Sequence, residues 1–414
     1  MKTLSRRWLF VGLLLCCLSF ACGGFDENSP PAASPDDSAL PAVAAVAPPA
    51  PSVSGHTSAP LYWPSDQRGP YAVGVTTIYL TDDERFEIWG MRDRELPLEI
   101  WYPSTGRGGH LNTLPDMVGE IPDWGMAAFQ AIYGDSFDEL WGVTTTAYRD
   151  AEVLPAGAPY PVIVFSHGLM AIRFQNFTLC EHLASHGFIV VAPDHYGNAI
   201  FTNLPPEDAV VIFNPVSTVT GVWDRPLDIE FVFARLSDLD WQVDSPFYLA
   251  MDLNRFAITG HSYGGLTSML SGLVTDYLAA IAPLNPAWVA GLYKKFDKPF
   301  LLLQSDTDNI VGFTNEASRK AWDQSQSKHK VFLNLINAGH YSATDACLLL
   351  PESVVPPSVS GCDGSMIDPV EANRISAAYL TAFFRAVMMR DARSAEYLRE
   401  NHFPGEVEVE TIWQ

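Results

Sequence analysis

Positive charge is scarce in this sequence, and so are motifs for nucleotides and metals. The 414 residues include 25 lysines and arginines against 48 aspartates and glutamates, which gives a formal net charge of −23. Such a balance opposes binding to nucleic acids and to anionic membrane surfaces. The sequence contains no Gly-rich phosphate loop, no dinucleotide fingerprint and no His or Cys cluster at metal-ligand spacing. We therefore expect no nucleic-acid partner, no metal and no cofactor.

The N-terminus has no apolar run of comfortable membrane-spanning length. The run at 8–20 follows three basic residues and has the length of a signal-peptide core. Ala21, Cys22 and Gly23 come directly after it and resemble a bacterial lipobox, in which the cysteine is lipidated. Residues 1–22 are therefore predicted to be a lipoprotein-type signal peptide. A simple cleaved signal is the alternative, and the general and twin-arginine export routes both stay open.

Residues 23–60 lack lysine and arginine and are rich in Pro, Ala and Ser. A segment of this composition cannot bury enough apolar surface to fold, and its prolines favour extended geometry. It is predicted to be a disordered linker that holds the folded part away from a membrane anchor. We accordingly expect an exported monomer, either a lipoprotein of the bacterial cell envelope, at the outer membrane, or a secreted protein. Contact with a membrane would come only through the N-terminal anchor.

Residues 61–414 are predicted to form one domain, since no second linker interrupts them. Strand-like apolar runs alternate with helix-like ones, which is typical of an α/β fold with a mostly parallel central sheet flanked by helices. Strands are predicted at 73–80, 97–102, 161–166, 188–193, 256–260, 279–284, 299–304 and 331–336. Helices are predicted at 174–186, 225–240, 263–274, 314–326 and 370–390.

Residues 260–265 read Gly-His-Ser-Tyr-Gly-Gly and lie between a predicted strand and a predicted helix. A serine at the apex of such a turn, flanked by glycines, is the pattern of a nucleophile elbow. The bare G-x-S-x-G motif also occurs by chance, so its context decides. The strand at 161–166 runs into a loop that includes Leu169, where the second oxyanion donor of an α/β-hydrolase arises. We predict Ser262 as the nucleophile and the backbone N–H groups of Leu169 and Tyr263 as the oxyanion hole.

A serine hydroxyl needs a general base, and the base needs an orienting carboxylate. In this fold they follow the serine in the order Asp or Glu, then His. The predicted strands at 299–304 and 331–336 end in loops that contain Asp308 and His340. We therefore predict a catalytic triad of Ser262, Asp308 and His340. Asp306 lies on the same loop as Asp308 and is the alternative acid.

Three motifs together resemble a known group of esterases. They are Val-Phe-Ser-His-Gly-Leu at 164–169, the segment at 183–195 and the elbow at 260–265. Their combination is similar to platelet-activating-factor acetylhydrolases and dienelactone-hydrolase-like esterases. Those acetylhydrolases take their triad Asp from the loop after the strand that follows the elbow helix, where this chain has Asn285. An acid one strand later, as at Asp308, is similar to bacterial cutinases and polyester hydrolases.

Aromatic side chains and histidines lie near the predicted triad. Trp288 stands about where the resemblance to cutinases implies an aromatic residue, and we expect it to bind substrate together with His261 and Tyr341. A structural role is expected for His167, which would fix the loop before Leu169. Two further histidines, four residues apart in a predicted helix, are interpreted as ordinary surface residues; they are His182 and His186.

Three of the six cysteines lie in the folded part. Cys347 and Cys362 are predicted to form a disulfide that holds the loop after His340, which an exported compartment permits. Cys180 would remain as a buried helix thiol. The alternative to the disulfide is that Cys347 and Cys362 are both free. The aromatic-rich insertion at 106–157 is expected beside the site, either as a lid or acyl-pocket wall or as ordinary packing.

We expect a serine carboxylic-ester hydrolase that acts through an acyl-enzyme. The resemblance implies short-acyl lipid esters, as for the acetylhydrolases, or other small esters as substrates. A cutinase-like polyester hydrolase is the first alternative. A non-catalytic lipoprotein that uses the fold as a binding module is the second, and the presence of Ser, Asp and His on three suitable loops argues against it.

Overall fold

The computed structural model describes residues 63–87, 92–119, 126, 130, 134, 137–200, 215–288, 296–349, 361–362 and 364–414. The predicted signal peptide, its Cys22 and the linker at 23–60 lie outside these residues. Within the described ranges, we find no helix with the length and hydropathy of a membrane span.

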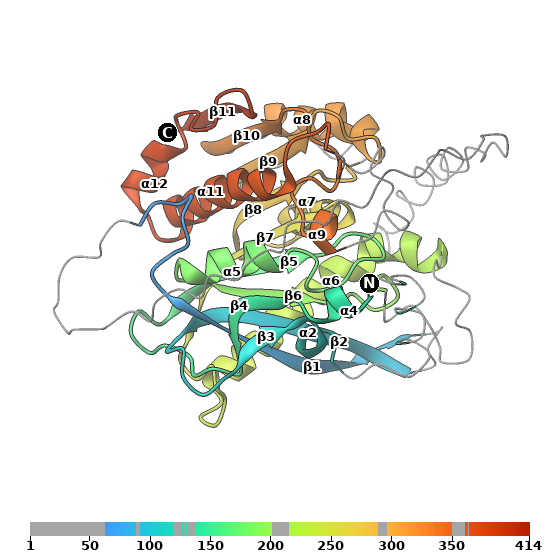
Figure 1. The fold of residues 1–414 in the computed structure, drawn as a ribbon, viewed down its shortest axis with the longest axis vertical. Helices are drawn as coiled ribbons and strands as arrows, with labels where there is room; N and C mark the ends of the chain where they lie inside the picture. Colours follow the sequence, from blue (N-terminus) through green and yellow to red (C-terminus); the bar gives the residue numbers. More distant parts are fainter. Residues whose placement is uncertain are drawn as a thin grey trace. The chain divides into compact units, whose positions relative to one another are not determined.

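The described strands form one 11-stranded sheet in the order β11-β10-β9-β8-β7-β5-β6-β2-β1-β4-β3 (Figure 1). The six strands from β5 to β10 run parallel to one another. At the two sides, β2 pairs antiparallel with β6, and β11 pairs antiparallel with β10. The strands are β1 (Ala72–Glu87), β2 (Arg92–Ser104), β3 (Leu111–Thr113), β4 (Thr144–Arg149), β5 (Tyr160–Ser166), β6 (Ile189–Pro193), β7 (Met251–His261), β8 (Leu278–Leu284), β9 (Phe300–Ser305), β10 (His329–Leu335) and β11 (Val407–Trp413).

The central strands are buried on both faces. Every residue of β5, β6 and β9 is buried, and their sequences are dominated by Val, Ile and Leu. Continuous apolar runs of this kind are expected for parallel strands that helices cover on each side. The sequence pattern therefore specifies the middle of the sheet directly.

Connection handedness decides which face each helix covers. The chain crosses the sheet in one direction from β5 to β6 and in the other from β6 to β7, and parallel crossovers are right-handed. The helices α5 and α6 consequently lie on opposite faces. α7 packs with α6, and α11 packs with α5 (Figure 1). The helices are α2 (Leu114–Val118), α4 (Phe137–Trp141), α5 (Phe177–Ser185), α6 (Pro215–Trp241), α7 (Tyr263–Val274), α8 (Asn315–Gln324), α9 (Ala346–Leu349), α11 (Pro369–Met388) and α12 (Ala392–Tyr397).

All eight predicted strands and all five predicted helices are present; α7 has the predicted bounds and the other elements have shifted ends. Three strands, β3, β4 and β11, were not predicted from the sequence. β11 reads Val-Glu-Val-Glu-Thr-Ile-Trp, an alternation of apolar and polar residues that suits an edge strand with one exposed face. β3 has three residues, too few for a periodic signal.

The described part of the insertion at 106–157 is ordinary packing. Its strands β3 and β4 extend the sheet, and its buried apolar side chains belong to the main core; they include Leu114, Met117, Leu140 and Ala147. This confirms the packing alternative for these residues, because their apolar faces contact the core.

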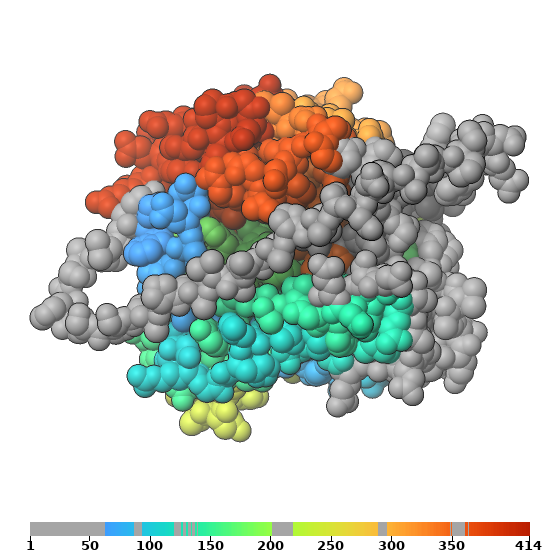
Figure 2. All heavy atoms as spheres, viewed as in Figure 1, coloured from blue at the N-terminus to red at the C-terminus, as the bar shows by residue number. Residues whose placement is uncertain are grey.

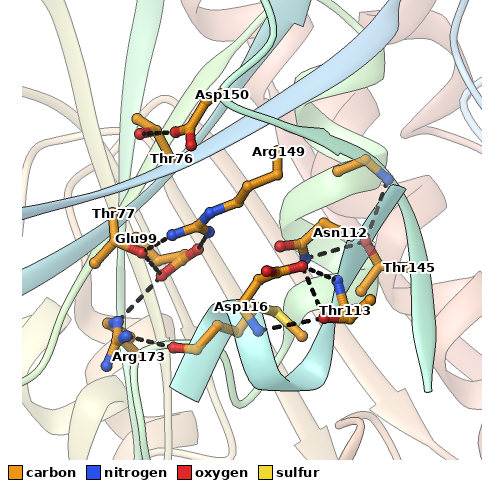
Figure 3. Close-up of polar contacts among 12 residues, drawn as sticks. Thr76, Thr77, Glu99, Asn112, Thr113, Asp116, Thr145, Arg149, Asp150 and Arg173 are labelled. Carbon is orange, nitrogen blue, oxygen red and sulfur yellow. Dashed lines mark hydrogen bonds and ion pairs between the residues drawn. The ribbon is translucent and has the colours of Figure 1, made fainter. Parts of the chain in front are cut away.

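A buried ion network joins the insertion to the loop that follows β5 (Figure 3). Glu99 on β2 accepts from Arg149 on β4 and, at 3.1 Å, from Nε of Arg173. The Arg173 guanidinium also binds Asp194 at 2.8 Å and the carbonyl of Met117 in α2. Burying charge is costly unless each group is paired and hydrogen-bonded, as these are. The network thus ties the insertion to the residues just beyond Leu169.

The first described residues lie on the surface of α11 and α5. Arg385 donates to the carbonyl of Trp63 at 2.7 Å, and in Figure 2 this N-terminal segment, coloured blue, lies beside the red C-terminal part. His186 donates to the carbonyl of Gln67 and His182 to that of Ser65, each at 2.9 Å. The prediction that these two histidines are ordinary surface residues is therefore wrong. Burial lowers the pKa of His186 to about 3, so its imidazole is neutral at physiological pH.

The structure contains the predicted disulfide. Cys347 and Cys362 are bonded and lie 15 residues apart, and Cys180 is a buried free thiol in α5, as expected. The bridge closes a chain segment that starts seven residues after His340. It therefore restrains the loop that carries the predicted base.

We expect the double substitution Cys347→Ser and Cys362→Ser to cost on the order of 2–4 kcal/mol of stability, because the unfolded chain loses a cross-link. Thermal unfolding should detect a drop of several degrees. Thiol titration of the unfolded, unreduced protein without its leader should find one reactive thiol, Cys180. Three reactive thiols would show that packing alone holds the loop.

Candidate active site

Ser262 occupies a strained turn between β7 and α7. Its backbone has φ 58° and ψ −116°, a conformation that L-residues rarely adopt. The flanking glycines allow the turn. A Cβ on Gly260 would lie 2.5 Å from the carbonyl oxygen of Ser166, and one on Gly264 would lie 1.8 Å from the same atom. The turn therefore has the geometry of a nucleophile elbow, pressed against the end of β5.

Asp308 and His340 meet at the carboxyl ends of β9 and β10. Asp308 Oδ2 lies 2.7 Å from His340 Nδ1, and Asp308 Oδ1 accepts from the N–H groups of Ile310 at 2.8 Å and Val311 at 2.9 Å. Burial by itself would raise the pKa of Asp308, but its contact with His340 and these N–H groups bring the pKa below its usual value. An ionised carboxylate therefore faces the imidazole Nδ1–H.

Asp306, the alternative acid, points elsewhere. It is exposed, and its Oδ1 accepts from the N–H of Ala338 at 3.1 Å and from the Thr307 hydroxyl at 2.8 Å. Only Asp308 of the two makes a hydrogen bond to His340 among the described residues. The geometry therefore favours Asp308 as the orienting acid.

Ser262 and His340 are connected through His261 and not by a direct hydrogen bond. Among the described residues, no hydrogen bond within 3.5 Å joins Ser262 Oγ to the His340 ring. Such contacts are often long without substrate and shorten in the reacting complex. The ring of His261, the residue before Ser262, lies 2.8 Å from the backbone carbonyl of His340. This contact brings the base loop to the elbow.

A hydrogen-bond relay through His261 connects the three loops of the site. Gly168 N–H donates to Gln175 Oε1 at 2.7 Å, and Gln175 Nε2 donates to His261 Nδ1 at 2.9 Å. His261 Nε2–H then donates to the carbonyl of His340. Each partner can act only in this direction, because a carbonyl can only accept. His261 is thereby held neutral, in agreement with burial and the nearby His340, which lower its pKa to about 3.

His261 was expected to contact substrate, and the structure places it differently. Its side chain is buried and all of its ring hydrogen bonds are to protein groups, so it supports the loops from behind. Trp288 is also buried, directly after β8. Tyr341 is half-buried, and its ring packs edge-on against that of His340 at 4.9 Å between centroids. Of these three residues, Tyr341 is therefore the one that is partly exposed beside His340.

The two residues predicted to supply the oxyanion donors belong to segments that adjoin Ser262. Tyr263 is the first residue of α7, where a backbone N–H has no partner inside the helix. Leu169 follows Gly168, whose α-carbon lies against the elbow: a Cβ there would be 3.6 Å from the Cβ of Ser262. The positive end of the α7 dipole adds to the attraction for a developing anion.

A second Ser-His-Asp arrangement lies beneath the site. Ser166 Oγ is 2.9 Å from His195 Nε2, and His195 Nδ1 is 2.8 Å from Asp228 Oδ2. All three side chains are fully buried, so no substrate reaches them. Burial lowers the pKa of His195 to about 4. The backbone N–H of His195 also donates to His167 Nε2 at 3.1 Å, which supports the structural role expected for His167.

Sequence reasoning missed two polar residues of the site, Gln175 and Asn285. Asn285 has φ 40°, and its Nδ2 donates to the carbonyl of His340 at 3.1 Å and to Ser305 Oγ at 3.0 Å. It thus shares the carbonyl that His261 binds. Asn285 could be noticed from its position directly after the strand at 279–284, whereas the sequence around Gln175 carries no such signal.

Two family models match the chain. Residues 63–209 match the model for platelet-activating factor acetylhydrolase, isoform II. Residues 152–355 match the PET hydrolase-like model, and this range includes Ser262, Asp308 and His340. The resemblance inferred from the motifs is thereby confirmed.

The chain is also similar in sequence to known esterases of these two groups. The chain is 25% identical over 278 residues to platelet-activating factor acetylhydrolase from Canis lupus familiaris, which covers 58% of this chain and 59% of that protein. It is 26% identical over 183 residues to cutinase est1 from Thermobifida alba, with 44% of this chain and 54% of that protein covered. The chain therefore spans less than two thirds of either relative.

A solved structure shows the fold. The structure of a ferulic acid esterase from Streptomyces cinnamoneus superposes with a TM-score of 0.64 at 24% identity, over 82% of this chain and 96% of that chain. Together with the mostly parallel sheet and the elbow, this defines the α/β-hydrolase fold.

The two carboxylates on one loop provide a matched pair of variants. We expect Asp308→Asn to lower turnover on an activated ester by about 10⁴-fold, since His340 loses its orienting anion. Asp306→Asn should stay close to wild type, because its carboxylate contacts the backbone at the protein surface. Steady-state kinetics of both variants measure this. The opposite ranking would move the acid to Asp306.

Proposed function

We propose that the protein is a serine carboxylic-ester hydrolase that works through an acyl-enzyme. The observation that supports this most is the strained Ser262 elbow beside a buried Asp308–His340 pair joined at 2.7 Å. The backbone N–H groups of Leu169 and Tyr263 are the proposed oxyanion donors. A binding module has no need of this combination.

In the proposed first step, His340 Nε2 takes the proton of Ser262 as Oγ bonds to the ester carbonyl carbon. The carbonyl π electrons move to oxygen, and the two N–H groups hold that oxyanion. Asp308 holds the His340 tautomer and stabilises the imidazolium. The intermediate then collapses, the ester C–O bond breaks, and His340 gives its proton to the leaving alkoxide. Water releases the acyl group by the same steps, with His340 again the base.

Small or lipid esters with short acyl groups are the proposed substrates. Support comes from the match of residues 63–209 to the acetylhydrolase model and from the relative in Canis lupus familiaris. A cutinase-like activity on polyesters is the second candidate. It is favoured by the match of residues 152–355 to the PET hydrolase-like model, the range that contains all three proposed triad residues.

A panel of p-nitrophenyl esters from acetate to palmitate tests this proposal, beside a phospholipid with a short sn-2 chain and a polyester film. We expect the highest kcat/KM on the shortest acyl groups. Release of soluble products from the film would favour the second candidate. Ser262→Ala should abolish all hydrolysis, and the absence of hydrolysis by the wild type on every substrate would contradict the proposal.

We further propose that the protein is exported and carries a lipid on Cys22, which supports anchoring at the bacterial cell envelope. The apolar run at 8–20 and the Ala-Cys-Gly that follows it support this. Mass spectrometry of the protein purified from producing cells should find diacylglycerol on an N-terminal Cys22. A mature N-terminus without lipid would indicate a secreted enzyme.

A further inference from the structure

Arg225 is a buried cation without a carboxylate partner. Its side chain is fully buried in α6, and in the described part of the chain no carboxylate oxygen lies within 4 Å of its guanidinium. The neighbouring buried arginines differ, because Arg94 binds Asp228 and Arg173 binds Asp194. Burial lowers the pKa of Arg225 to about 10, so it stays charged at neutral pH. An unpaired buried charge is expensive and requires an explanation.

The guanidinium binds the backbone of the oxyanion loop. Nη1 donates to the carbonyl of His167 at 2.6 Å, and Nη2 donates to the carbonyl of Gly168 at 3.3 Å. Nε donates to Asn198 Oδ1 at 3.0 Å. The planar, fixed arrangement of N–H groups in an arginine suits these three oxygens better than a lysine would.

The contact between Arg225 and the Gly168 carbonyl also sets the direction of the Leu169 N–H. The C=O and N–H of a trans peptide point in opposite directions. With its carbonyl held by Arg225 and, at 2.6 Å, by His167 Nδ1, the Gly168 peptide must direct the Leu169 N–H to the other side. A cation at the carbonyl end also polarises the peptide, which strengthens the N–H as a donor.

The same guanidinium packs against the second donor residue. Its Cζ lies over the Tyr263 ring, 4.5 Å from the centroid. The Tyr263 hydroxyl donates to the carbonyl of Thr218 at 2.5 Å, so α6 contacts both the ring and the hydroxyl of this side chain. Arg225 therefore contacts both the Gly168–Leu169 peptide, through the Gly168 carbonyl, and the side chain of Tyr263.

We propose that Arg225 is the positioning residue of the oxyanion hole and that its charge stabilises the tetrahedral intermediate through the Gly168–Leu169 peptide. This inference rests on the proposed ester hydrolysis. It adds that the buried Arg225 side chain of α6 orients the Leu169 N–H. Arg225 lies outside the motifs from which the site was predicted.

The test compares Arg225→Gln, which removes the charge, with Arg225→Lys, which keeps it. Each is measured for kcat and KM on p-nitrophenyl acetate and for binding of a trifluoromethyl ketone, which forms an oxyanion adduct with serine. The corresponding alcohol, which cannot form the adduct, reports ground-state binding. We expect Arg225→Gln to lose about 10²–10³-fold in kcat and in ketone affinity. KM and alcohol binding should change little, and Arg225→Lys should recover most of the loss.

Lys330 is the matched control. It is a buried cation that donates to three carbonyls, of Trp322 at 2.6 Å, Asp323 at 3.2 Å and Ser325 at 3.3 Å, and it lies over the Trp322 ring at 4.4 Å. It makes these contacts at the end of α8, away from the elbow. Lys330→Met should lower the melting temperature and leave kcat and ketone affinity unchanged.

Arg225→Gln with kcat and ketone affinity within a few fold of wild type would overturn the inference. Equal losses of kcat and ketone affinity in Arg225→Gln and Arg225→Lys would overturn the claim that the charge of Arg225 stabilises the intermediate. If Arg225→Gln does not fold, Asn198→Ala replaces it, because it removes the oxygen that Arg225 Nε binds and so loosens the guanidinium on the Gly168 carbonyl. A smaller loss of kcat and ketone affinity, again with KM and alcohol binding little changed, is expected there, and wild-type values would overturn the inference. Wild-type esterase activity in Ser262→Ala would instead refute the proposed ester hydrolysis. The failure of the Arg225 inference and the failure of the proposed function therefore give different results.

Discussion

The contact between the end of β5 and the elbow controls the rest of the site. The carbonyl oxygen of Ser166 lies so close to Gly260 and Gly264 that a side chain at either position would collide with it. Because the chain continues from Ser166 to Gly168 and Leu169, this one contact sets the oxyanion loop beside the nucleophile. Substitution of either glycine would therefore disturb the two parts together.

Buried polar networks then hold each loop from behind. On one side, the relay from Gly168 through Gln175 and His261 ends at the carbonyl of His340. On the other side, Arg225 holds the carbonyls of the oxyanion loop. Polar groups in a low-dielectric interior are costly unless satisfied, and satisfied ones give a single arrangement. Preorganised donors of this kind need no reorganisation when charge develops on the substrate.

The sequence predicted the central sheet and the candidate triad because both rest on local patterns. Buried parallel strands such as β5 give unbroken apolar runs, and the elbow has a short motif around Ser262. The choice between Asp306 and Asp308 could not be made locally, since it depends on which side chain the loop turns inward. The buried positions of His186 and His261 also depend on partners far away in the chain, and the sequence carries no local sign of them.

The proposed role of Arg225 could not be predicted from the sequence either. In the sequence it lies in an amphipathic helix and looks like any other helical arginine. Its importance follows from two tertiary facts, the absence of a carboxylate partner among the described residues and its contacts with Gly168 and Tyr263. Residues that act through others in this way are visible only once the elements are packed.

The central claim is that Ser262 is an activated nucleophile in a preorganised site. Covalent labelling tests it most directly: the native protein is treated with a fluorophosphonate, digested and examined by mass spectrometry. The account predicts a single adduct on Ser262, loss of esterase activity in proportion to labelling, and no adduct on the buried Ser166. An adduct on another serine that accounts for the lost activity, or full activity after complete labelling of Ser262, would contradict it.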